Sequence, residues 1–266
     1  MPIRVRSLVA FLAAGWLAMV AAGVRAAAWI TPAGSAGVVV FLVAAGAYVL
    51  YVYYPPFDPA GQTVWRGDRK GALVAITFDD GPGNDTAAIL DVLARKGVAA
   101  TFFFLGENAG RHPDLVARAR AEGHAVGNHG TTHVKMHRLG VAAIERELRG
   151  GEGALGAIAT LGGRKILRVP HGFKSITLAR TARRLGYTLV AWTAGVWDSD
   201  RPGAEVIASR AAAAIGPGCI LLLHDGDGTK PAADRSQTAA ALPAIIDHGL
   251  QAGYRFVTIP QLFERR

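Results

Sequence analysis

The chain has 266 residues, of which 51% are hydrophobic and 18% charged, and this apolar composition excludes an intrinsically disordered protein. Its single cysteine, Cys219, excludes an internal disulfide, a cysteine zinc cluster and a CxxC redox site. The formal net charge is +9, but no Lys/Arg tract is interleaved with aromatic residues, so we expect no nucleic-acid partner.

Two uncharged apolar segments, 7–24 and 36–54, open the chain, and residues 1–54 contain no acidic side chain. Each segment is close to the roughly 20 residues that cross a bilayer, so we predict a membrane anchor of one or two transmembrane helices over 1–54. The first segment follows Arg4 and Arg6 and precedes small residues, a pattern that also fits a cleavable signal peptide.

The orientation of such an anchor stays open. Basic residues at the amino terminus favour an inside start, and two spans from that start would return the rest of the chain to the cytoplasm. A single effective span or an outside start would export it. We expect a membrane-anchored protein whose catalytic domain lies on the outer (periplasmic or extracellular) face, with the cytoplasmic face as the alternative.

After the anchor, prolines at 55, 56 and 59 cannot continue a helix, so we predict a linker over 55–70 and a globular domain over 71–266. Predicted strands in this domain cover 73–78, 99–105, 124–128, 166–169, 187–192, 219–223 and 256–259. Predicted helices cover 85–96, 113–122, 141–159, 176–185, 204–215 and 237–252. This alternation predicts an α/β fold with right-handed crossovers and a mostly parallel sheet.

Unusual polar clusters follow five of the predicted strands, at 77–82, 128–133, 168–172, 197–200 and 222–226. Active residues of parallel α/β folds lie at the carboxyl ends of strands. Five clusters from five strand ends converge only if the strands curl around a common axis, so the pattern favours a barrel over an open sheet.

Two of these clusters carry metal-binding side chains. Asp79 and Asp80 end a buried strand before a Gly-Pro turn, and His129 and His133 are spaced by four, which brings two imidazoles to one face. Two histidines and one of the two aspartates form a three-ligand site that leaves a position for water, as in hydrolytic metal centres. We expect His137 to lie outside this site.

In this order, the TFDDGP segment at 77–82, NHxxxH at 128–133, RxPxG at 168–172, an Asp-containing turn and LLH at 222–224 resemble the polysaccharide deacetylases. This family is also known as carbohydrate esterase family 4, or the NodB-homology domain, and the resemblance covers roughly 71–266. It implies a distorted (β/α) barrel that binds one divalent metal ion, usually Zn²⁺, with Co²⁺, Ni²⁺ or Mn²⁺ as alternatives. It also implies hydrolysis of an N-acyl group from an amino sugar.

The resemblance assigns roles residue by residue. The implied metal ligands are Asp80, His129 and His133. The implied base is Asp79, tethered by Arg168, and the implied acid is His224. Asp198 matches the aspartate of the fourth motif, and the main-chain amide of His171 matches the family's oxyanion donor.

Three positions depart from the family pattern: Gly130 replaces Ser or Thr, His171 replaces Tyr, and Ser199 replaces Trp. These departures bear on the substrate. The expected activity is removal of an N-acetyl group from a cell-surface or cell-wall glycan. Alternatives are a deacetylase or deformylase of a polyprenyl-linked amino sugar at the membrane, and a non-catalytic glycan-binding barrel.

Overall fold

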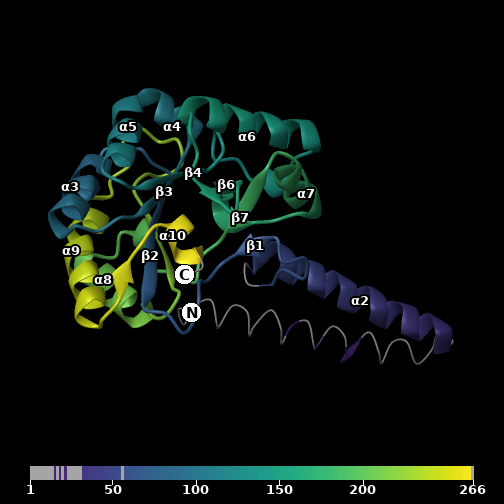
Figure 1. The fold of residues 1–266 in the computed structure, drawn as a ribbon. Coiled ribbons are helices and arrows are strands. Elements are labelled where there is room, and N and C mark those ends of the chain that lie inside the picture. Colours follow the sequence, from purple (N-terminus) through teal and green to yellow (C-terminus); the bar gives the residue numbers. More distant parts are fainter. Residues whose placement is uncertain (1–14, 16–17, 19–20, 23–31, 55–56, 265–266) are drawn as a thin grey trace.

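Parallel strands form one curled sheet in the computed structural model, which describes residues 15, 18, 21–22, 32–54 and 57–264 (Figure 1). The strands are β1 (Thr63–Val64), β2 (Leu73–Asp79), β3 (Thr101–Phe104), β4 (Ala125–Asn128), β5 (Thr160–Leu161), β6 (Arg164–Leu167), β7 (Tyr187–Val190), β8 (Ala194–Gly195), β9 (Ile220–His224) and β10 (Arg255–Phe256). Their order is β1-β7-β6-β4-β3-β2-β9-β8, with β10 beside β2 and only β5 antiparallel. The sheet is therefore a curled half-barrel, which confirms the predicted parallel α/β architecture.

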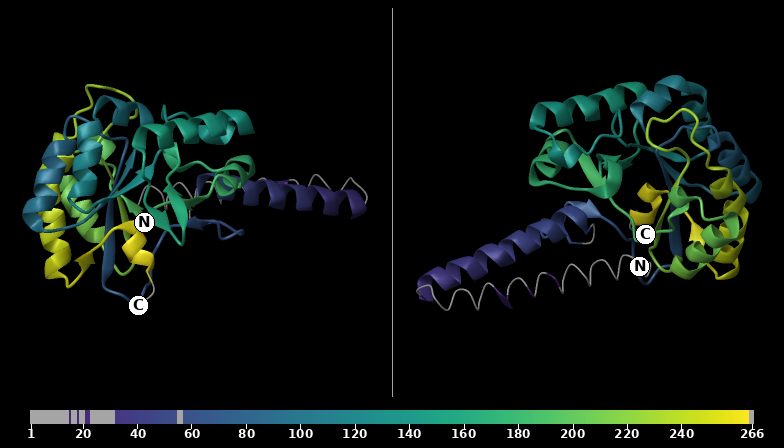
Figure 2. Two further views of the ribbon diagram at one scale, coloured as in Figure 1. Left: turned by 45° about the horizontal axis from the view of Figure 1, so that its top comes forward. Right: turned by 180° about the vertical axis from the view of Figure 1, so that it is seen from behind.

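Helices cover the outer side of this sheet (Figures 1 and 2). They are α3 (Thr86–Lys96), α4 (Gly106–Arg111), α5 (Pro113–Ala121), α6 (Val141–Leu155), α7 (Ile176–Arg184), α8 (Ala204–Ala214) and α9 (Ser236–Gln251), while α10 (Ile259–Phe263) lies against β2 and β5. Short 3₁₀ turns occur at Met136–Arg138, Pro170–Gly172 and Asp198–Asp200. All seven predicted strands and all six predicted helices are present, with ends shifted by a few residues.

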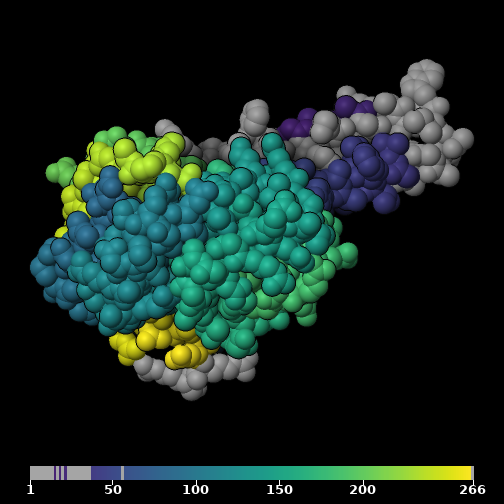
Figure 3. All heavy atoms as spheres, turned by 90° about the horizontal axis from the view of Figure 1, so that it is seen from above, coloured from purple at the N-terminus to yellow at the C-terminus, as the bar shows by residue number. Residues whose placement is uncertain are grey.

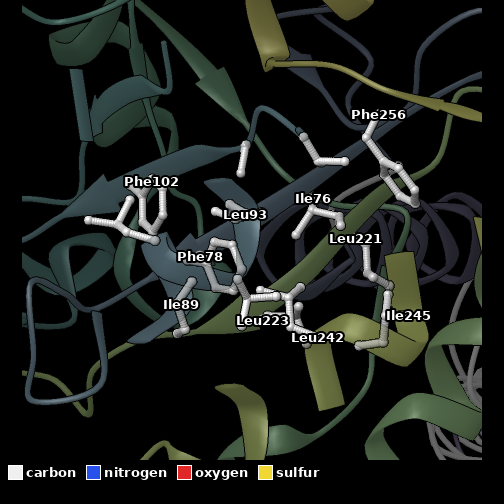
Figure 4. Close-up of a cluster of buried hydrophobic side chains, with 14 of the residues drawn as sticks. Ile76, Phe78, Ile89, Leu93, Phe102, Leu221, Leu223, Leu242, Ile245 and Phe256 are labelled. Carbon is white, nitrogen blue, oxygen red and sulfur yellow. The ribbon is translucent and has the colours of Figure 1, made fainter. Parts of the chain in front are cut away.

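Period-two alternation divides β2 between two environments. Val74, Ile76 and Phe78 belong to the main core between the sheet and the helices, where Ile76 and Phe78 lie near Leu242 and Ile245 of α9 (Figure 4). Ala75 belongs to a second cluster inside the half-barrel. That inner cluster includes Ile259 and Leu262 of α10, which fill the half-barrel near the start of β2. Asp79 shares the inner face with Ala75, so the strand aims its terminal carboxylate into the half-barrel.

The segment expected to be a linker contributes a strand. β1 pairs in parallel with β7, and Trp65, which follows it, accepts a hydrogen bond at its carbonyl from the Thr193 hydroxyl at 2.7 Å. The sheet therefore begins within residues 55–70. The two residues of the edge strand β1 are too few to give a strand pattern in a segment that is otherwise rich in turn residues and prolines.

Helix α2 (Pro32–Tyr53) precedes β1 and extends away from the body of the molecule (Figures 1 and 3). Its side chains Val40 and Phe41 are 68% and 70% exposed. In the part of the chain that the structure describes, no helix has the combined length and apolarity of a membrane span, so the predicted transmembrane helices are unsupported. Apart from positions 15, 18, 21 and 22, the first apolar segment, 7–24, lies outside the described residues.

Candidate active site

Asp80 begins the turn after β2 in the left-handed region, at φ 75°. Its main-chain carbonyl accepts a hydrogen bond from the Asn108 side-chain amide at 2.6 Å, and its Oδ2 accepts one from the Gly228 amide at 3.0 Å. Asn108 also donates to the Gly228 carbonyl at 2.9 Å. Asp80 is 5% exposed. These contacts hold the carboxylate in one orientation, with Oδ1 directed away from them.

His129 and His133 follow β4 and converge on Asp80. Their Nε2 atoms lie 3.2 Å and 3.0 Å from Asp80 Oδ1. The Nδ1 atom of His129 lies 2.8 Å from the Arg168 carbonyl, which can only accept, so Nδ1 carries the proton and Nε2 presents a lone pair. The structure thus assembles the predicted Asp-His-His group and identifies Asp80, rather than Asp79, as its carboxylate.

The donor set fits a divalent cation. Asp80 Oδ1 is buried and, among the described residues, has no hydrogen-bond partner, although two imidazole nitrogens face it. Tetrahedral ligands about 2.0–2.2 Å from a zinc ion are separated by about 3.3–3.6 Å, and each imidazole nitrogen lies only slightly closer than this to Asp80 Oδ1, at 3.2 and 3.0 Å. Burial alone would lower the pKa of His129, but Asp79 and Asp80 raise it. Burial alone would raise the pKa of Asp80, but the two imidazoles hold it well below its usual range. The pocket therefore favours positive charge, which a metal ion would supply while leaving the imidazoles neutral.

Asp79 is held from inside the half-barrel by Arg168, which is fully buried. The guanidinium Nη1 donates to Asp79 Oδ1 at 2.8 Å and to the Thr77 hydroxyl at 2.7 Å, both on the inner face of β2. Its other nitrogens donate to the carbonyls of Val190 and Ala191 in and after β7, so the predicted tether spans the sheet. This geometry leaves the second Asp79 oxygen to other partners.

His224 ends β9 directly beside Asp79, which is its register partner on β2. Asp198 accepts from both the ring Nδ1 of His224 at 2.9 Å and its main-chain amide at 2.8 Å, and also from the Thr238 hydroxyl at 3.0 Å. Burial alone would lower the pKa of His224, but the Asp198 carboxylate outweighs it and the pKa rises to about 9. A carboxylate and a protonated imidazole therefore stand side by side next to the triad.

His171 occupies a left-handed position at φ 61° in the 3₁₀ turn after β6. Its ring centroid lies 4.5 Å from that of His133, so the third polar cluster does reach the metal triad. A Cβ on the next residue, Gly172, would lie 2.3 Å from the Trp192 ring, and this close approach requires glycine. His137 lies outside the triad, as expected, with its ring against Phe173 and Tyr53.

Two buried side chains that hold the turn containing Asp80 and Gly81, Asp225 and Asn108, were not predicted from the sequence. Asp225 is 1% exposed; it accepts the Gly81 amide at 3.0 Å and the Thr86 hydroxyl at 2.6 Å. Its place directly after His224 in the fifth polar cluster was a signal that could have revealed it. Asn108 had no such signal, since it lies in the short helix α4 that was not predicted.

A parallel half-barrel with a metal-binding triad, a tethered carboxylate and a carboxylate-paired imidazole at its strand ends is the arrangement of a metal-dependent hydrolase. Comparison with known proteins agrees. The family model described as "Polysaccharide deacetylase" matches residues 66–190. The chain belongs to the polysaccharide deacetylase family, carbohydrate esterase family 4. Its relatives named as N-deacetylases are hydrolases that act on carbon–nitrogen bonds other than peptide bonds, and the chain is a hydrolase of this class.

Individual relatives extend the match over most of the globular domain. A peptidoglycan-N-acetylglucosamine deacetylase of Bacillus cereus is 34% identical over 77% of this chain and 94% of its own length. A chitooligosaccharide deacetylase of Rhizobium leguminosarum bv. trifolii is 38% identical over 79% of this chain and 98% of its own. A crystal structure of a peptidoglycan N-acetylglucosamine deacetylase superposes with a TM-score of 0.70 at 30% identity, covering 77% and 94% of the two chains.

Proposed function

We propose that this chain removes the N-acetyl group from N-acetylglucosamine units of a cell-wall or surface glycan. The relatives named as peptidoglycan and chitooligosaccharide deacetylases support this substrate class. The observation that carries the proposal is the pair Asp79 and His224 beside the Asp80 triad, because hydrolysis of an amide needs both a base for water and an acid for the amine.

Asp80, His129 and His133 would hold a divalent ion, which would polarise the amide carbonyl and make a bound water more acidic. Asp79, oriented by Arg168, accepts the proton of the attacking water as its oxygen bonds to the carbonyl carbon. The main-chain amide of His171 donates to the developing oxyanion, a contribution of about 3 kcal/mol for one donor. His224 then protonates the leaving nitrogen, the C–N bond breaks, and acetate and a free amino sugar result.

Acetate release by the purified full-length chain with added Zn²⁺ tests this function, with chitopentaose and peptidoglycan as substrates. We expect Asp79→Asn and His224→Ala each to lower kcat by about 10²- to 10⁴-fold. Asp114→Asn, on the exposed first turn of α5, is the matched control and retains wild-type kcat. Absence of acetate from every N-acetylated substrate, with Asp79→Asn indistinguishable from wild type, would support a non-catalytic glycan-binding barrel instead.

The compartment follows from the substrate. Peptidoglycan lies outside the cytoplasmic membrane, so this function requires the catalytic domain on the outer face. A topology reporter fused after Arg266 tests that requirement. A signal confined to the cytoplasm would contradict it and would favour the polyprenyl-linked amino sugar, which the same acetate assay can then examine.

A further inference from the structure

A continuous series of rings runs from the metal triad to helix α2. The His133 ring lies 4.5 Å from His171, His171 stacks on Phe173 at 6.0 Å with an interplanar angle of 20°, and Phe173 contacts Tyr53 at 4.9 Å. His137 supports this series from the side, 5.1 Å from Phe173. Tyr53 belongs to the last turn of α2, before the segment that the family model matches.

The end of α2 is attached to the loop that carries His171 and Phe173. The Lys174 amide donates to the Val52 carbonyl at 3.1 Å, and the Lys174 ammonium donates to the Phe57 carbonyl at 3.2 Å. The same ammonium lies 4.8 Å from the centroid of the Tyr51 ring. Lys174 is 2% exposed and Val52 is 5% exposed, so this attachment is part of the core. The position of Tyr53 is therefore fixed relative to the triad.

Two rings of this series are exposed to solvent, and Phe173 between them is half-buried. Tyr53 is 51% exposed and His171 is also exposed, although both stand among aromatic neighbours that could have buried them. Aromatic faces bind apolar surfaces with a defined geometry, and the C–H face of a pyranose ring is such a surface. Binding sites of this kind combine aromatic walls with a few polar groups, which the imidazoles and the tyrosine hydroxyl supply here.

We propose that Tyr53, Phe173 and His171 form a sugar-binding surface that holds a glycan unit next to the unit whose amide lies at the triad. This inference rests on the proposed function and gives it a substrate preference: oligosaccharides bind better than short amino sugars because a neighbouring unit contacts Tyr53. Helix α2 thereby contributes to the site itself.

Steady-state kinetics of the full-length chain on a chitooligosaccharide series test the surface. For Tyr53→Ala we expect KM for the pentasaccharide to rise by about two- to tenfold, with kcat nearly unchanged and a smaller effect on the disaccharide. Tyr53→Phe keeps the ring and loses only the hydroxyl, so KM should return most of the way to the wild-type value. Phe41→Ala is the control, since Phe41 is more exposed than Tyr53 on the same helix but lies about 18 Å away along its axis.

A binding measurement separates this inference from the proposed function. In the Asp79→Asn background, calorimetry compares the affinities for the disaccharide and the pentasaccharide with and without Tyr53→Ala. If the pentasaccharide binds more tightly than the disaccharide, and Tyr53→Ala reduces that difference in affinity, the result supports the sugar-binding surface. This holds even if the wild-type chain releases no acetate. The inference is overturned if that gain is unchanged, if no oligosaccharide binds, or if Tyr53→Ala lowers kcat equally for every length.

Discussion

Replacing Asp198 with Asn removes one charge from the pair that tunes the proposed acid, at nearly constant volume. Asp198 is 1% exposed and contacts both the ring and the main chain of His224. A His224 pKa of about 9, against an ordinary 6.5, corresponds to roughly 3 kcal/mol in favour of the imidazolium. Burial opposes that charge, so without the Asp198 carboxylate the pKa falls toward its ordinary value, although Asp80 and Asp79 still raise it.

The lower pKa of His224 in the variant reduces activity at alkaline pH. The acid must be protonated, so activity is lost as pH rises through the pKa of His224. At pH 8 a group with pKa 9 is about 90% protonated and one with the ordinary pKa of 6.5 about 3%, whereas at pH 6 both are mostly protonated. The loss of activity in the variant relative to wild type is therefore up to about 20-fold larger at pH 8 than at pH 6. A bound metal ion lowers the His224 pKa in both wild type and Asp198→Asn. The predicted quantity is therefore the difference in pH between the alkaline limbs of their activity profiles.

The assay is kcat/KM for acetate release between pH 5 and 10, because this ratio reports the ionisation of the free enzyme. Thr238→Val removes only the hydroxyl that donates to Asp198 and is the control, with an alkaline limb close to that of wild type. Thermal unfolding of each variant verifies that the fold is retained. Coincident alkaline limbs for Asp198→Asn and wild type would refute the role assigned to this carboxylate.

Three further variants probe the metal and the tether. His129→Ala removes a ligand, so the purified protein should lose its stoichiometric zinc, as measured by plasma mass spectrometry; full zinc content would contradict the triad. Asn108→Ala frees the Asp80 main chain and should weaken metal affinity by about 10- to 100-fold in a competition titration, whereas unchanged affinity would show that Asn108 does not position Asp80. Arg168→Met leaves the Asp79 carboxylate buried without its partner and should lower the free energy of unfolding by about 3–5 kcal/mol in urea, a cost that an equally stable variant would disprove.

Local patterns in the sequence predict the strands and the His129/His133 pair, because each depends on residues close together in the chain. The aspartate of the triad comes from another strand end, and its approach follows from the parallel sheet, which brings the carboxyl ends of β2 and β4 to one edge. The inner and outer faces of β2 follow from its alternation, and the four-residue spacing of His129 and His133 places both rings on Asp80. The sequence alone does not decide whether Asp79 or Asp80 is the metal ligand. That assignment depends on the φ of 75° at Asp80 and on the hydrogen bond from Arg168 to Asp79. Arg168 follows β6, which lies three strands away from β2 in the sheet.

Groups that act through distant contacts could not be predicted in this way. Asn108 reaches Asp80 and Gly228 across 28 and 120 residues of sequence, and α4, which carries it, is too short and Gly-rich to show a helical period. Tyr53 was assigned to the apolar N-terminal segment, and only tertiary packing shows that its ring contacts Phe173. The prediction of a membrane span over 36–54 rests on composition. Composition does not show that the last turn of α2 packs against Phe173 and Lys174.

The left-handed residues of the site set a limit on how this protein can be stabilised. Asp80, His133, His171, Trp197 and Arg201 are non-glycine residues with positive φ, and all lie in loops beyond the carboxyl ends of strands. Such conformations cost about 1–3 kcal/mol each, so glycine at these positions would relieve the backbone. Selection for thermal stability alone would therefore favour glycine at Asp80, His133 or His171, and such variants lack a metal ligand or the His171 ring. Stabilising substitutions are better placed on the outer helices, at positions other than Asn108 and Thr238, which contact Asp80 and Asp198.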